Sequence, residues 1–304
     1  MVDIVIVNWN SGSYLAKCIS SIFTAENKDL LGSVFVIDNA SSDNSIDNLP
    51  IHSKLTIIKN NSNSGFARAC NQGFMLCSSP YILLLNSDAQ LLDITLTKCM
   101  IFMDKHPEID VCGCQLLNER NEISISCARF PTPVRILYDA SGLSKLAPKI
   151  FTPSTLMTDF DHKSNRFVNQ VMGAFMFIRK SAFEKTGYFD ERYFVYFEEL
   201  DFSKTLSEKG GKIYFTPDIQ AKHAGEGSTK AVKSFRLFLF LQSRILYAKK
   251  HFNKAGIMLT IFSTYFIEPL TRSLLSILRV RPGEIKEIWK AYFQLLSNKN
   301  NQGE

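Results

Sequence analysis

Several features that would define a class of protein at once are missing from this sequence of 304 residues. The N-terminal stretch MVDIVIVNWN has no basic segment and no small-residue cleavage site, so we expect no signal peptide. No GxGxxG motif follows the first apolar segment, and no Walker A motif occurs, which argues against a dinucleotide dehydrogenase and a phosphate-loop NTPase. Internal repeats are absent too, so a solenoid or propeller is not expected.

Cysteine is present but in no pattern that predicts a disulfide framework. The sequence has 7 cysteines, an odd number, scattered through apolar stretches, and only Cys112 and Cys114 lie close together. That pair lacks a second pair at zinc-ligand spacing, so buried thiols in a strand are favoured over a metal site. We expect a reduced, cytosolic compartment.

Charge is unevenly distributed along the chain. The net charge is +6, yet residues 230–292 contain twelve Lys or Arg and three Glu, a local excess of +9 that leaves −3 for the remainder. The C-terminal part is therefore a different kind of surface. We predict a first domain over residues 1–229, with halves 1–110 and 111–229, and a basic helical extension over 230–304 whose tail, 298–304, is disordered.

Apolar runs of strand length alternate with helix-like segments over the first ninety residues. The runs are apolar throughout, as in strands covered by helices on both faces of a parallel sheet. Strands are predicted at Ile4–Asn8, Val34–Asp38, Leu55–Lys59 and Tyr81–Asn86, and helices at Tyr14–Phe23 and Gly65–Cys77. Further on we predict a short strand and turn within Asp110–Cys127, loops over the site at Ala128–Arg166, strands at Gln170–Arg179 and Lys212–Thr216, and helices at Ser181–Thr186 and Glu198–Lys209.

Polar residues end three of the predicted strands. They are Asn8 with Trp9, Asp38 with Asn39, and Asn86 with Ser87 and Asp88. Because ligands of such sheets bind outside the carboxyl ends of the strands, we expect these residues to meet in one crevice. Asp88 can hold a hard divalent cation, whose other ligands are diphosphate oxygens and water. The alternative is that Asn-Ser-Asp forms a simple turn.

The order of these segments resembles a known family. The runs VIVNWNSGSYLAKCISSI, VIDNASSDNS, NSNSGFARACNQGF and YILLLNSDA are similar to the inverting family 2 of glycosyltransferases. The downstream run GAFMFIRKSAFEKTGYFDERYFVYFEELDFSKTLSEKGGKIYF resembles the acceptor-side signature of its rhamnosyltransferase-like branch. The resemblance covers about residues 3–229. It implies an α/β protein of the GT-A fold, with a Rossmann-like, mostly parallel central sheet flanked by helices and a C-terminal helical extension.

The resemblance assigns a nucleotide-sugar site to the first half of the chain. It implies that Asp38 binds the base, that Trp9 lies against the face of the base and that Arg68 lies near the diphosphate, with Asn8, Asn86 and Ser87 in the same site. The chemistry agrees, because a carboxylate accepts the imide N–H of uracil or thymine, an indole stacks and a guanidinium suits phosphate. The alternatives are a helix-capping Asp38, a core Trp9 and a solvated Arg68.

The metal site differs from the usual pattern of the family. Asn86 stands where the usual DxD signature has its first aspartate, so Asp88 is the one carboxylate that this segment offers to Mg²⁺ or Mn²⁺. His223, in the segment AKHAGEGS, matches a position that often supplies a second ligand. The alternative is a solvated histidine in a polar loop.

The catalytic base is expected in the segment FEELD. The resemblance implies that Glu199 deprotonates the acceptor hydroxyl, although the family usually has the shorter aspartate there. It also implies an acceptor site that contains Glu198, with Asp190, Glu191 and Gly173 on the same side. Asp201 can share the helix face of Glu198. The alternative is an acidic helix start that the helix dipole stabilises.

The function implied is an inverting, metal-dependent hexosyl transfer in cell-surface polysaccharide synthesis. The donor would be dTDP-rhamnose or a UDP-sugar, and the acceptor a hydroxyl of a saccharide or of a lipid-linked saccharide. No clear carboxylate nucleophile for a retaining double displacement is visible. Two alternatives stay open. One is a non-catalytic nucleotide-sugar-binding protein of the same fold. The other is a nucleotidyltransferase, which would normally have a basic, glycine-rich loop after the first strand, whereas the segment NWNSGSYL lacks the basic residue.

The C-terminal part contains two apolar runs, Phe235–Tyr247 and Gly256–Ile267, with basic residues between them. Both are shorter than the about 18 residues of a membrane span. They fit helices at an anionic membrane surface, which suits a polyprenyl-linked acceptor and a place at the cytosolic face of a bacterial membrane. Packing on the first domain, or a homodimer through these helices, is the alternative. No nucleic-acid-binding module is visible.

Overall fold

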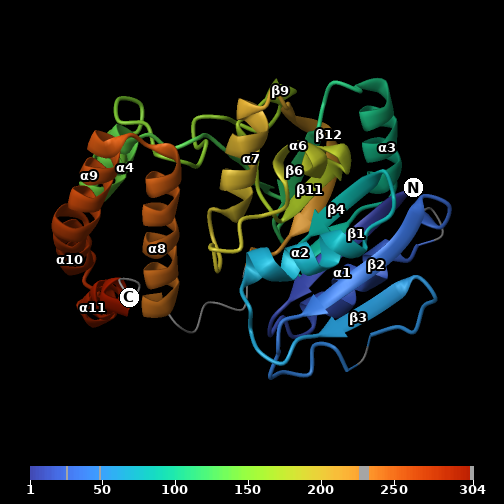
Figure 1. Cartoon of the computed structure of the whole chain (residues 1–304), viewed down its shortest axis with the longest axis horizontal. Coiled ribbons are helices and arrows are strands. Elements are labelled where there is room, and N and C mark those ends of the chain that lie inside the picture. Colours follow the sequence, from blue (N-terminus) through green and yellow to red (C-terminus); the bar gives the residue numbers. More distant parts are fainter. Residues whose placement is uncertain (25–26, 48, 226–232, 302–304) are drawn as a thin grey trace. The chain divides into compact units, whose positions relative to one another are not determined.

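The computed structural model describes residues 1–24, 27–47, 49–225 and 233–301, which form two compact units (Figure 1). The sheet unit comprises Met1–Ala128, Phe160–Phe194 and Glu198–Ser228. The helical unit comprises Arg129–Asp159, Val195–Phe197 and Thr229–Glu304. The predicted boundary between residues 229 and 230 lies outside the described residues.

One mixed sheet organises the sheet unit. Its strand order is β3-β2-β1-β4-β11-β6-β12-β5, with β7 beside β6 and β9 beside β12, and a separate small sheet pairs β10 with β8. The strands are β1 (Val2–Asn8), β2 (Leu31–Asp38), β3 (Leu55–Lys59), β4 (Tyr81–Leu85), β5 (Ala89–Leu91), β6 (Val111–Leu117), β7 (Ile123–Ser124), β8 (Cys127–Ala128), β9 (Arg166–Phe167), β10 (Gln170–Val171), β11 (Phe175–Arg179) and β12 (Ile213–His223). The pairs β1–β2, β2–β3, β1–β4 and β6–β12 are parallel, whereas β11 runs antiparallel between β4 and β6.

The central strands are apolar because both faces of the sheet are covered. Every residue of β1 and of β4 is buried, which is expected for strands with helices on both sides. The covering helices are α1 (Tyr14–Ile22), α2 (Phe66–Leu76) and α3 (Thr95–Lys105), followed by α6 (Ser181–Thr186) and α7 (Glu198–Glu208). Helix α2 packs on β1 and β2, and α1 packs near β5. The predictions for this part of the chain are confirmed to within a few residues.

Three segments of the sheet unit differ from the sequence prediction. Gln170–Arg179 is not one strand, because the chain breaks at Met172–Ala174 between β10 and β11. The last strand is longer than Lys212–Thr216 and continues to His223, where it pairs with the unpredicted strand β5. His223 is therefore a strand residue and not a loop residue.

The helical unit contains most of the segment expected to be loops, namely Arg129–Asp159. Residues Ala128–Arg166 include two helices, α4 (Pro133–Ala140), which Thr132 caps, and α5 (Leu143–Leu146). The other helices are α8 (Lys233–His251), α9 (Lys254–Phe262), the π-helical turn η3 (Ser263–Ile267), α10 (Glu268–Leu278) and α11 (Gly283–Asn301). The helical extension is thus confirmed, and α11 extends to Asn301, while the disorder predicted for the tail stays a prediction. Residues 302–304 lie outside the described residues.

A buried ion-pair cluster joins α8 to α10. Arg244 Nη2 donates to Glu268 Oε2 and, over 2.8 Å, to Thr264 Oγ1, while Arg272 Nη2 donates to Glu268 Oε1 over 2.6 Å. Burial alone would raise the pKa of Glu268, but the two guanidinium groups lower it below its ordinary value. Two cations on one buried carboxylate fix the register of these helices, since neither side can be left unpaired without a large desolvation cost.

All seven cysteines are buried free thiols, and Cys112 and Cys114 lie inside β6, as expected. Burial raises the pKa of each of these two thiols.

Within the described part of the chain, no helix combines the length and the apolar character needed to cross a membrane.

Candidate active site

Asn8 and Asp38 meet at the carboxyl ends of two neighbouring strands. Because β1 and β2 are parallel and in register at Asn8 and Asp38, the Asn8 amide nitrogen donates to Asp38 Oδ1 over 2.7 Å and to Ser45 Oγ over 2.9 Å. Asn8 is fully buried, so its side chain holds Asp38 in place. Asp38 also accepts from Ser41 Oγ over 2.6 Å, and its Oδ2 accepts from the Ser41 N–H over 3.3 Å. Since a carboxylate has about four lone-pair positions, Asp38 retains capacity for a ligand donor.

Asn39 orders the loop that leads into α2. Its amide donates to Asn63 Oδ1 over 2.8 Å and to the Gly65 carbonyl over 3.1 Å, and its oxygen accepts from Ser64 N. Gly65 has φ of 89°, and a Cβ there would lie 2.6 Å from the carbonyl oxygen of Phe194. Only glycine fits this close approach of two backbones. The start of α2 is thereby fixed beside the segment that precedes α7.

Arg68 lies on the first turn of α2, beside Glu191. Its Nε is 3.8 Å from Glu191 Oε2, and the two side chains are 62% and 45% exposed. A pair this exposed is weak and leaves the guanidinium available to another anion. Glu191 is held from the other side by Asn71, whose amide donates to Glu191 Oε1 over 3.0 Å and to the Phe189 carbonyl over 2.8 Å. Sequence reasoning missed Asn71, although a polar side chain on the buried face of α2 was a signal.

The strand register brings Asp88 and His223 together. β5 and β12 are antiparallel with Ala89 opposite His223, and the Ala224 N–H donates to the Asp88 carbonyl over 3.1 Å. His223 Nε2 lies 3.2 Å from Asp88 Oδ1, and both side chains are nearly buried, at 13% and 9% exposure. Both predicted metal ligands therefore lie side by side, although the chain separates them widely.

These two residues fit a divalent cation that is held largely by a substrate. Among the described residues no group of three or more His, Cys, Asp or Glu side chains could hold a metal. A carboxylate and an imidazole can supply two positions, and Mg²⁺ commonly takes its remaining ligands from waters and substrate phosphates. The neighbouring residues Asn86 and Ser87 are half-buried at the same strand end.

Glu199 faces the break between β10 and β11. A Cβ on Gly173 would lie 3.3 Å from Glu199 Oε1, and the Gly173 N–H donates a hydrogen bond to the Glu199 carboxylate. The next carbonyl, that of Ala174, accepts from the Asn86 N–H over 3.1 Å. Residues 173 and 174 therefore contact both the Glu199 carboxylate and the strand end that precedes Asp88.

The two carboxyl groups at the start of α7 form a buried pair. Burial raises the pKa of Glu198 well above its ordinary value, and the adjacent Glu199 carboxylate raises it further. Burial also raises the pKa of Glu199, while backbone N–H groups and a hydrogen bond from Glu198 partly offset that rise. Glu198 Oε2 and Glu199 Oε2 have no hydrogen-bond partner among the described residues. Such a perturbed carboxyl pair is typical of a proton-transfer site.

The remaining predicted residues lie nearby but are less defined. Asp190 binds Arg192, whose Nη2 and Nε donate over 2.6 Å and 2.9 Å. Trp9 is half-buried just after β1. Asp201 shares the buried face of α7 with Glu198 and accepts from Tyr193 Oη over 3.3 Å.

The residues directly before α7 are strained. Tyr196 and Phe197 have φ of 69° and 72°, a left-handed conformation that costs bulky side chains about 1–3 kcal/mol each. Contacts with α8 hold them, because the Phe197 ring packs at a tilt against Phe240 and Tyr247 and the Val195 carbonyl accepts from Ser243 Oγ over 2.8 Å. No pattern in the sequence predicted this strain.

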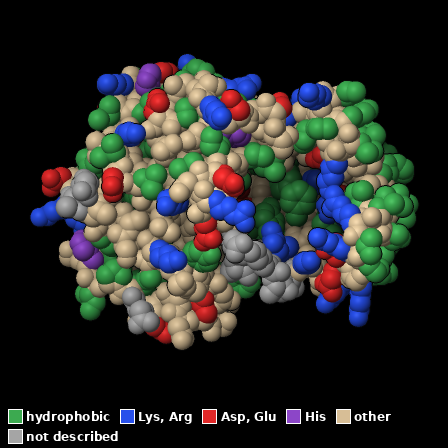
Figure 2. Space-filling model, turned by 180° about the vertical axis from the view of Figure 1, so that it is seen from behind, with side chains coloured by type: hydrophobic (Ala, Val, Ile, Leu, Met, Phe, Trp, Pro, Cys, Tyr) green, Lys and Arg blue, Asp and Glu red, His purple; other side chains and the backbone are tan. Residues whose placement is uncertain are grey.

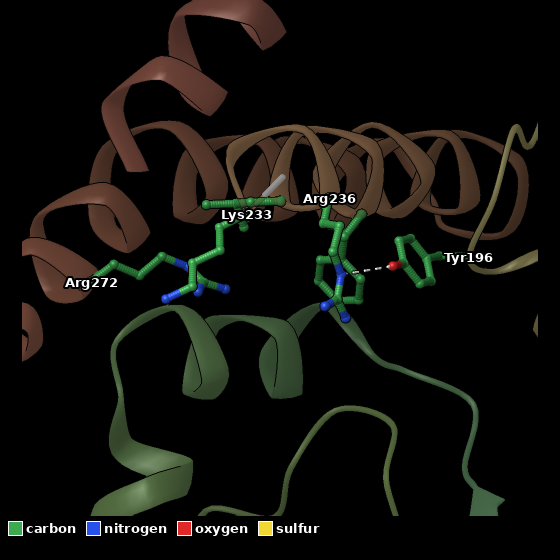
Figure 3. A pocket seen from close by; sticks show the side chains of 6 residues that line it. Tyr196, Lys233, Arg236 and Arg272 are labelled. Carbon is green, nitrogen blue, oxygen red and sulfur yellow. Dashed lines mark hydrogen bonds between the residues drawn. The ribbon is translucent and has the colours of Figure 1, made fainter. Parts of the chain in front are cut away.

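Tyr196 lines a basic pocket within the helical unit. The pocket has a volume of about 400 Å³ and is lined by Tyr196, Lys233, Arg236, Leu237, Phe240 and Arg272. Figure 3 shows Lys233 and Arg272 converging while Arg236 reaches Tyr196. Lys233 and Arg272 have carboxylate partners, Glu284 and Glu268. For Arg236 the described residues offer a hydroxyl, Tyr196 Oη at 3.4 Å, and no carboxylate within 4 Å.

Comparison with solved structures defines the fold as that of a GT-A glycosyltransferase. The chain is similar to the mannosyltransferase PcManGT from Pyrobaculum calidifontis, in complex with GDP-Man and Mn²⁺, with a TM-score of 0.56 and 14% identity over 98% of this chain and 87% of that one. It is also similar to TarS from S. aureus in complex with UDP-GlcNAc, with a TM-score of 0.52 and 17% identity over 95% and 79% of the two chains. The predicted fold class is thus confirmed.

The family follows from the sequence comparisons. The family model described as "Glycosyl transferase family 2" matches residues 3–187, so the chain belongs to that family. It is 21% identical to an N-acetylglucosaminyl-diphospho-decaprenol L-rhamnosyltransferase of Mycobacterium tuberculosis over 75% of this chain and 78% of the relative. It is 22% identical to a low-salt glycan biosynthesis hexosyltransferase of Haloferax volcanii over 83% and 77%. Within the family the chain is rhamnosyltransferase-like, as predicted.

Proposed function

We propose that this protein is an inverting glycosyltransferase that moves a sugar from a nucleoside diphosphate onto a hydroxyl of a lipid-linked saccharide. The observation that carries the proposal is the contact of residues 173 and 174 with both Glu199 and the strand end before Asp88. That contact supports a site in which a carboxylate base and a diphosphate-binding edge serve one substrate pair.

The donor is held by the strand ends. Asp38, kept in position by Asn8, accepts the imide N–H of a pyrimidine base, and Trp9 offers a face for stacking. Arg68 donates to the diphosphate, which displaces the weak contact with Glu191. Asp88 and His223 would hold a Mg²⁺ or Mn²⁺ ion. When bound, this ion would neutralise negative charge on the leaving diphosphate.

The transfer step needs one base. The acceptor oxygen attacks the anomeric carbon and forms the new C–O bond while the bond to the phosphate oxygen breaks. Glu199 takes the proton of the acceptor hydroxyl, and the nucleoside diphosphate leaves with the bonding electron pair. Attack from the face opposite the leaving group inverts the anomeric configuration. Asp190, Glu191 and Glu198 lie on the acceptor side of this arrangement.

The sugar is proposed from the relatives. The name of the relative from Mycobacterium tuberculosis specifies L-rhamnose transfer to an N-acetylglucosaminyl-diphospho-decaprenol. This supports a dTDP-rhamnose donor, with UDP-hexoses next, and a diphosphate-linked lipid saccharide as acceptor. Such an acceptor resides in a membrane, so we place the reaction at the cytosolic face of a bacterial membrane, in cell-surface polysaccharide synthesis.

A transfer assay tests the proposal. With Mn²⁺ or Mg²⁺ present, we expect sugar transfer from dTDP-rhamnose, and thermal stabilisation by this nucleotide sugar above that by other donors in a panel. Stabilisation without transfer or donor hydrolysis would favour a non-catalytic binding protein. Pyrophosphate release from a nucleoside triphosphate would favour a nucleotidyltransferase.

The basic lining of the pocket supports the proposal that the acceptor carries a diphosphate. Three of its six lining residues are cationic, and Tyr196, which is three residues before Glu199 in the chain, lines it too. A lipid diphosphate is a dianion or more, which this set of cations and aromatic rings can bind. Arg236 is the cation that best tests this role, because its hydrogen-bond partner among the described residues is a neutral hydroxyl.

Replacing Arg236 should weaken acceptor binding selectively. We expect Arg236→Gln to raise the KM for the diphosphate-linked saccharide by about tenfold, since one hydrogen bond to a charged group contributes about 1.5–3 kcal/mol. The KM for the donor, and for the same saccharide without its diphosphate, should not change. Arg120→Gln, which removes an exposed arginine of the sheet unit, is the matched control. Equal KM changes for both acceptors would contradict the role.

A further inference from the structure

The long helix formed by α9, η3 and α10 is apolar on its outside and polar on its inside. Its six large side chains at intervals of four, Met258, Phe262, Phe266, Leu270, Leu274 and Leu278, are all exposed, and we call them the apolar stripe. Phe266 and Leu270 are each 63% exposed and Leu274 is 57% exposed. The buried residues of the same helix include Thr260, Ser263, Thr264, Glu268 and Ser276. This is the reverse of a helix on a water-soluble surface, whose apolar face is turned inward.

Most of these buried polar side chains are hydrogen-bonded within the helical unit, although Thr260 Oγ1 has no partner among the described residues. Thr264 Oγ1 donates to the Thr260 carbonyl over 2.6 Å and accepts from Arg244, and Glu268 is held by two arginines. The polar interior is therefore a stable arrangement, and turning the helix over would expose an ion-pair cluster. The apolar stripe is fixed on the outside.

The π-helical turn keeps the stripe on one face. In an α-helix, a residue four places further on lies about 40° past a full turn, so a stripe at intervals of four drifts around the helix. The turn Ser263–Ile267 has more residues per turn and cancels part of this drift. It also precedes Pro269, which has no N–H to donate. The stripe is about 30 Å long, since its ends are twenty residues apart at about 1.5 Å per residue.

Basic side chains flank both ends of the stripe. Lys249, Lys250 and Lys254 are exposed before it, and Arg279, Arg281, Lys286 and Lys290 are exposed after it. Figure 2 shows hydrophobic side chains gathered over this part of the helical unit with Lys and Arg beside them. Glu268, the one carboxylate between Lys254 and Arg281, is buried and paired. The rim is therefore mainly basic, with seven Lys and Arg against Glu284 and Glu287, of which Glu284 lies 3.9 Å from Arg281.

We propose that the apolar stripe docks on an anionic lipid bilayer, with the helix lying in the plane of the surface. Exposed aromatic and aliphatic side chains enter the boundary between headgroups and acyl chains, and the rim of Lys and Arg meets the anionic headgroups. A second copy of this chain fits the stripe less well, because a symmetric dimer would bring like-charged rims together. The proposal extends the proposed function by naming the surface through which the enzyme reaches a membrane-resident acceptor.

Vesicle sedimentation of the full chain tests the proposal. We expect wild-type protein to sediment with vesicles that contain phosphatidylglycerol, less so with neutral phosphatidylcholine vesicles, and less so at high salt. The double variant Phe266→Glu/Leu270→Glu should lower the vesicle–water partition coefficient by more than about tenfold. Each apolar side chain that enters the bilayer contributes about a factor of ten to this coefficient. The matched control is Met75→Glu/Ile101→Glu, which changes two exposed apolar side chains of the sheet unit, at 59% and 50% exposure.

Two outcomes would overturn the proposal. One is equal sedimentation of wild type and the stripe variant, or no sedimentation of either. The other is that light scattering shows a wild-type dimer that binds no vesicles and that becomes a monomer in the stripe variant. This result would assign the stripe to contact with a second copy of the chain. Transfer to a water-soluble acceptor, measured in parallel, should be unchanged in the stripe variant. Loss of transfer in all proteins would refute the proposed function and leave the vesicle result standing.

Discussion

Glu199→Gln should abolish sugar transfer while leaving the nucleotide sugar bound. The amide keeps the size of the side chain but cannot take a proton, so we expect kcat to fall by about 10²–10⁴-fold, the range typical for loss of a general base. Thermal stabilisation by the donor should persist, because the proposed role of Glu199 is toward the acceptor. Steady-state transfer assays and thermal shift with dTDP-rhamnose measure the two effects.

Glu208→Gln is the control on the same helix. Glu208 is 52% exposed and pairs with Lys204 over 2.9 Å, so its replacement should leave transfer unchanged. Glu199→Asp should recover part of the activity, because it restores a carboxylate that is one methylene shorter. Full activity of Glu199→Gln would refute the assignment of the base.

The pH profile offers an independent readout of the same residue. Burial raises the pKa of Glu199, so at low pH a larger fraction of the enzyme holds the base in its protonated, inactive form. We expect kcat/KM to rise with pH through a pKa above that of an ordinary glutamate and to level off once the base is ionised. The small residual rate of Glu199→Gln should lack this limb.

The first half of the fold could be predicted because its signals are local. Long apolar runs such as Tyr81–Leu85 define strands without any tertiary information, and their polar ends mark the binding edge. Strand β5 has three residues, too few for any periodicity, so its pairing with β12 was missed. The break at Gly173 was missed because the residues on both sides are equally apolar.

The sequence suggested candidate site residues one by one, but it did not suggest their geometry. The 3.2 Å approach of Asp88 and His223 follows from the pairing of Ala89 with His223, which is a tertiary fact. The buried pair of Glu198 and Glu199 depends in the same way on the position of Gly173. In the C-terminal helices, the spacing in the sequence shows that Phe266 and Thr264 lie on different faces of one helix. It does not show which of the two faces is exposed.

Asp88→Asn should remove most of the metal-dependent activity. We expect kcat/KM to fall by about 10²–10³-fold, since a bound cation contributes several kcal/mol of stabilisation to the transition state and about 1.4 kcal/mol corresponds to a factor of ten. The concentration of Mn²⁺ that gives half-maximal activity should rise in the same variant. His223→Ala should shift this concentration in the same direction but by less, because the carboxylate carries the charge.

The matched control for this prediction is Asp93→Asn. Asp93 is exposed five residues further along the chain, so its replacement removes the same charge without touching the pair of Asp88 and His223. Its metal titration should match that of the wild type. Because Asp88 and His223 would share one cation, the double variant Asp88→Asn/His223→Ala should be little worse than Asp88→Asn alone. Fully additive losses, or unchanged metal titration in Asp88→Asn, would show that the cation is held elsewhere.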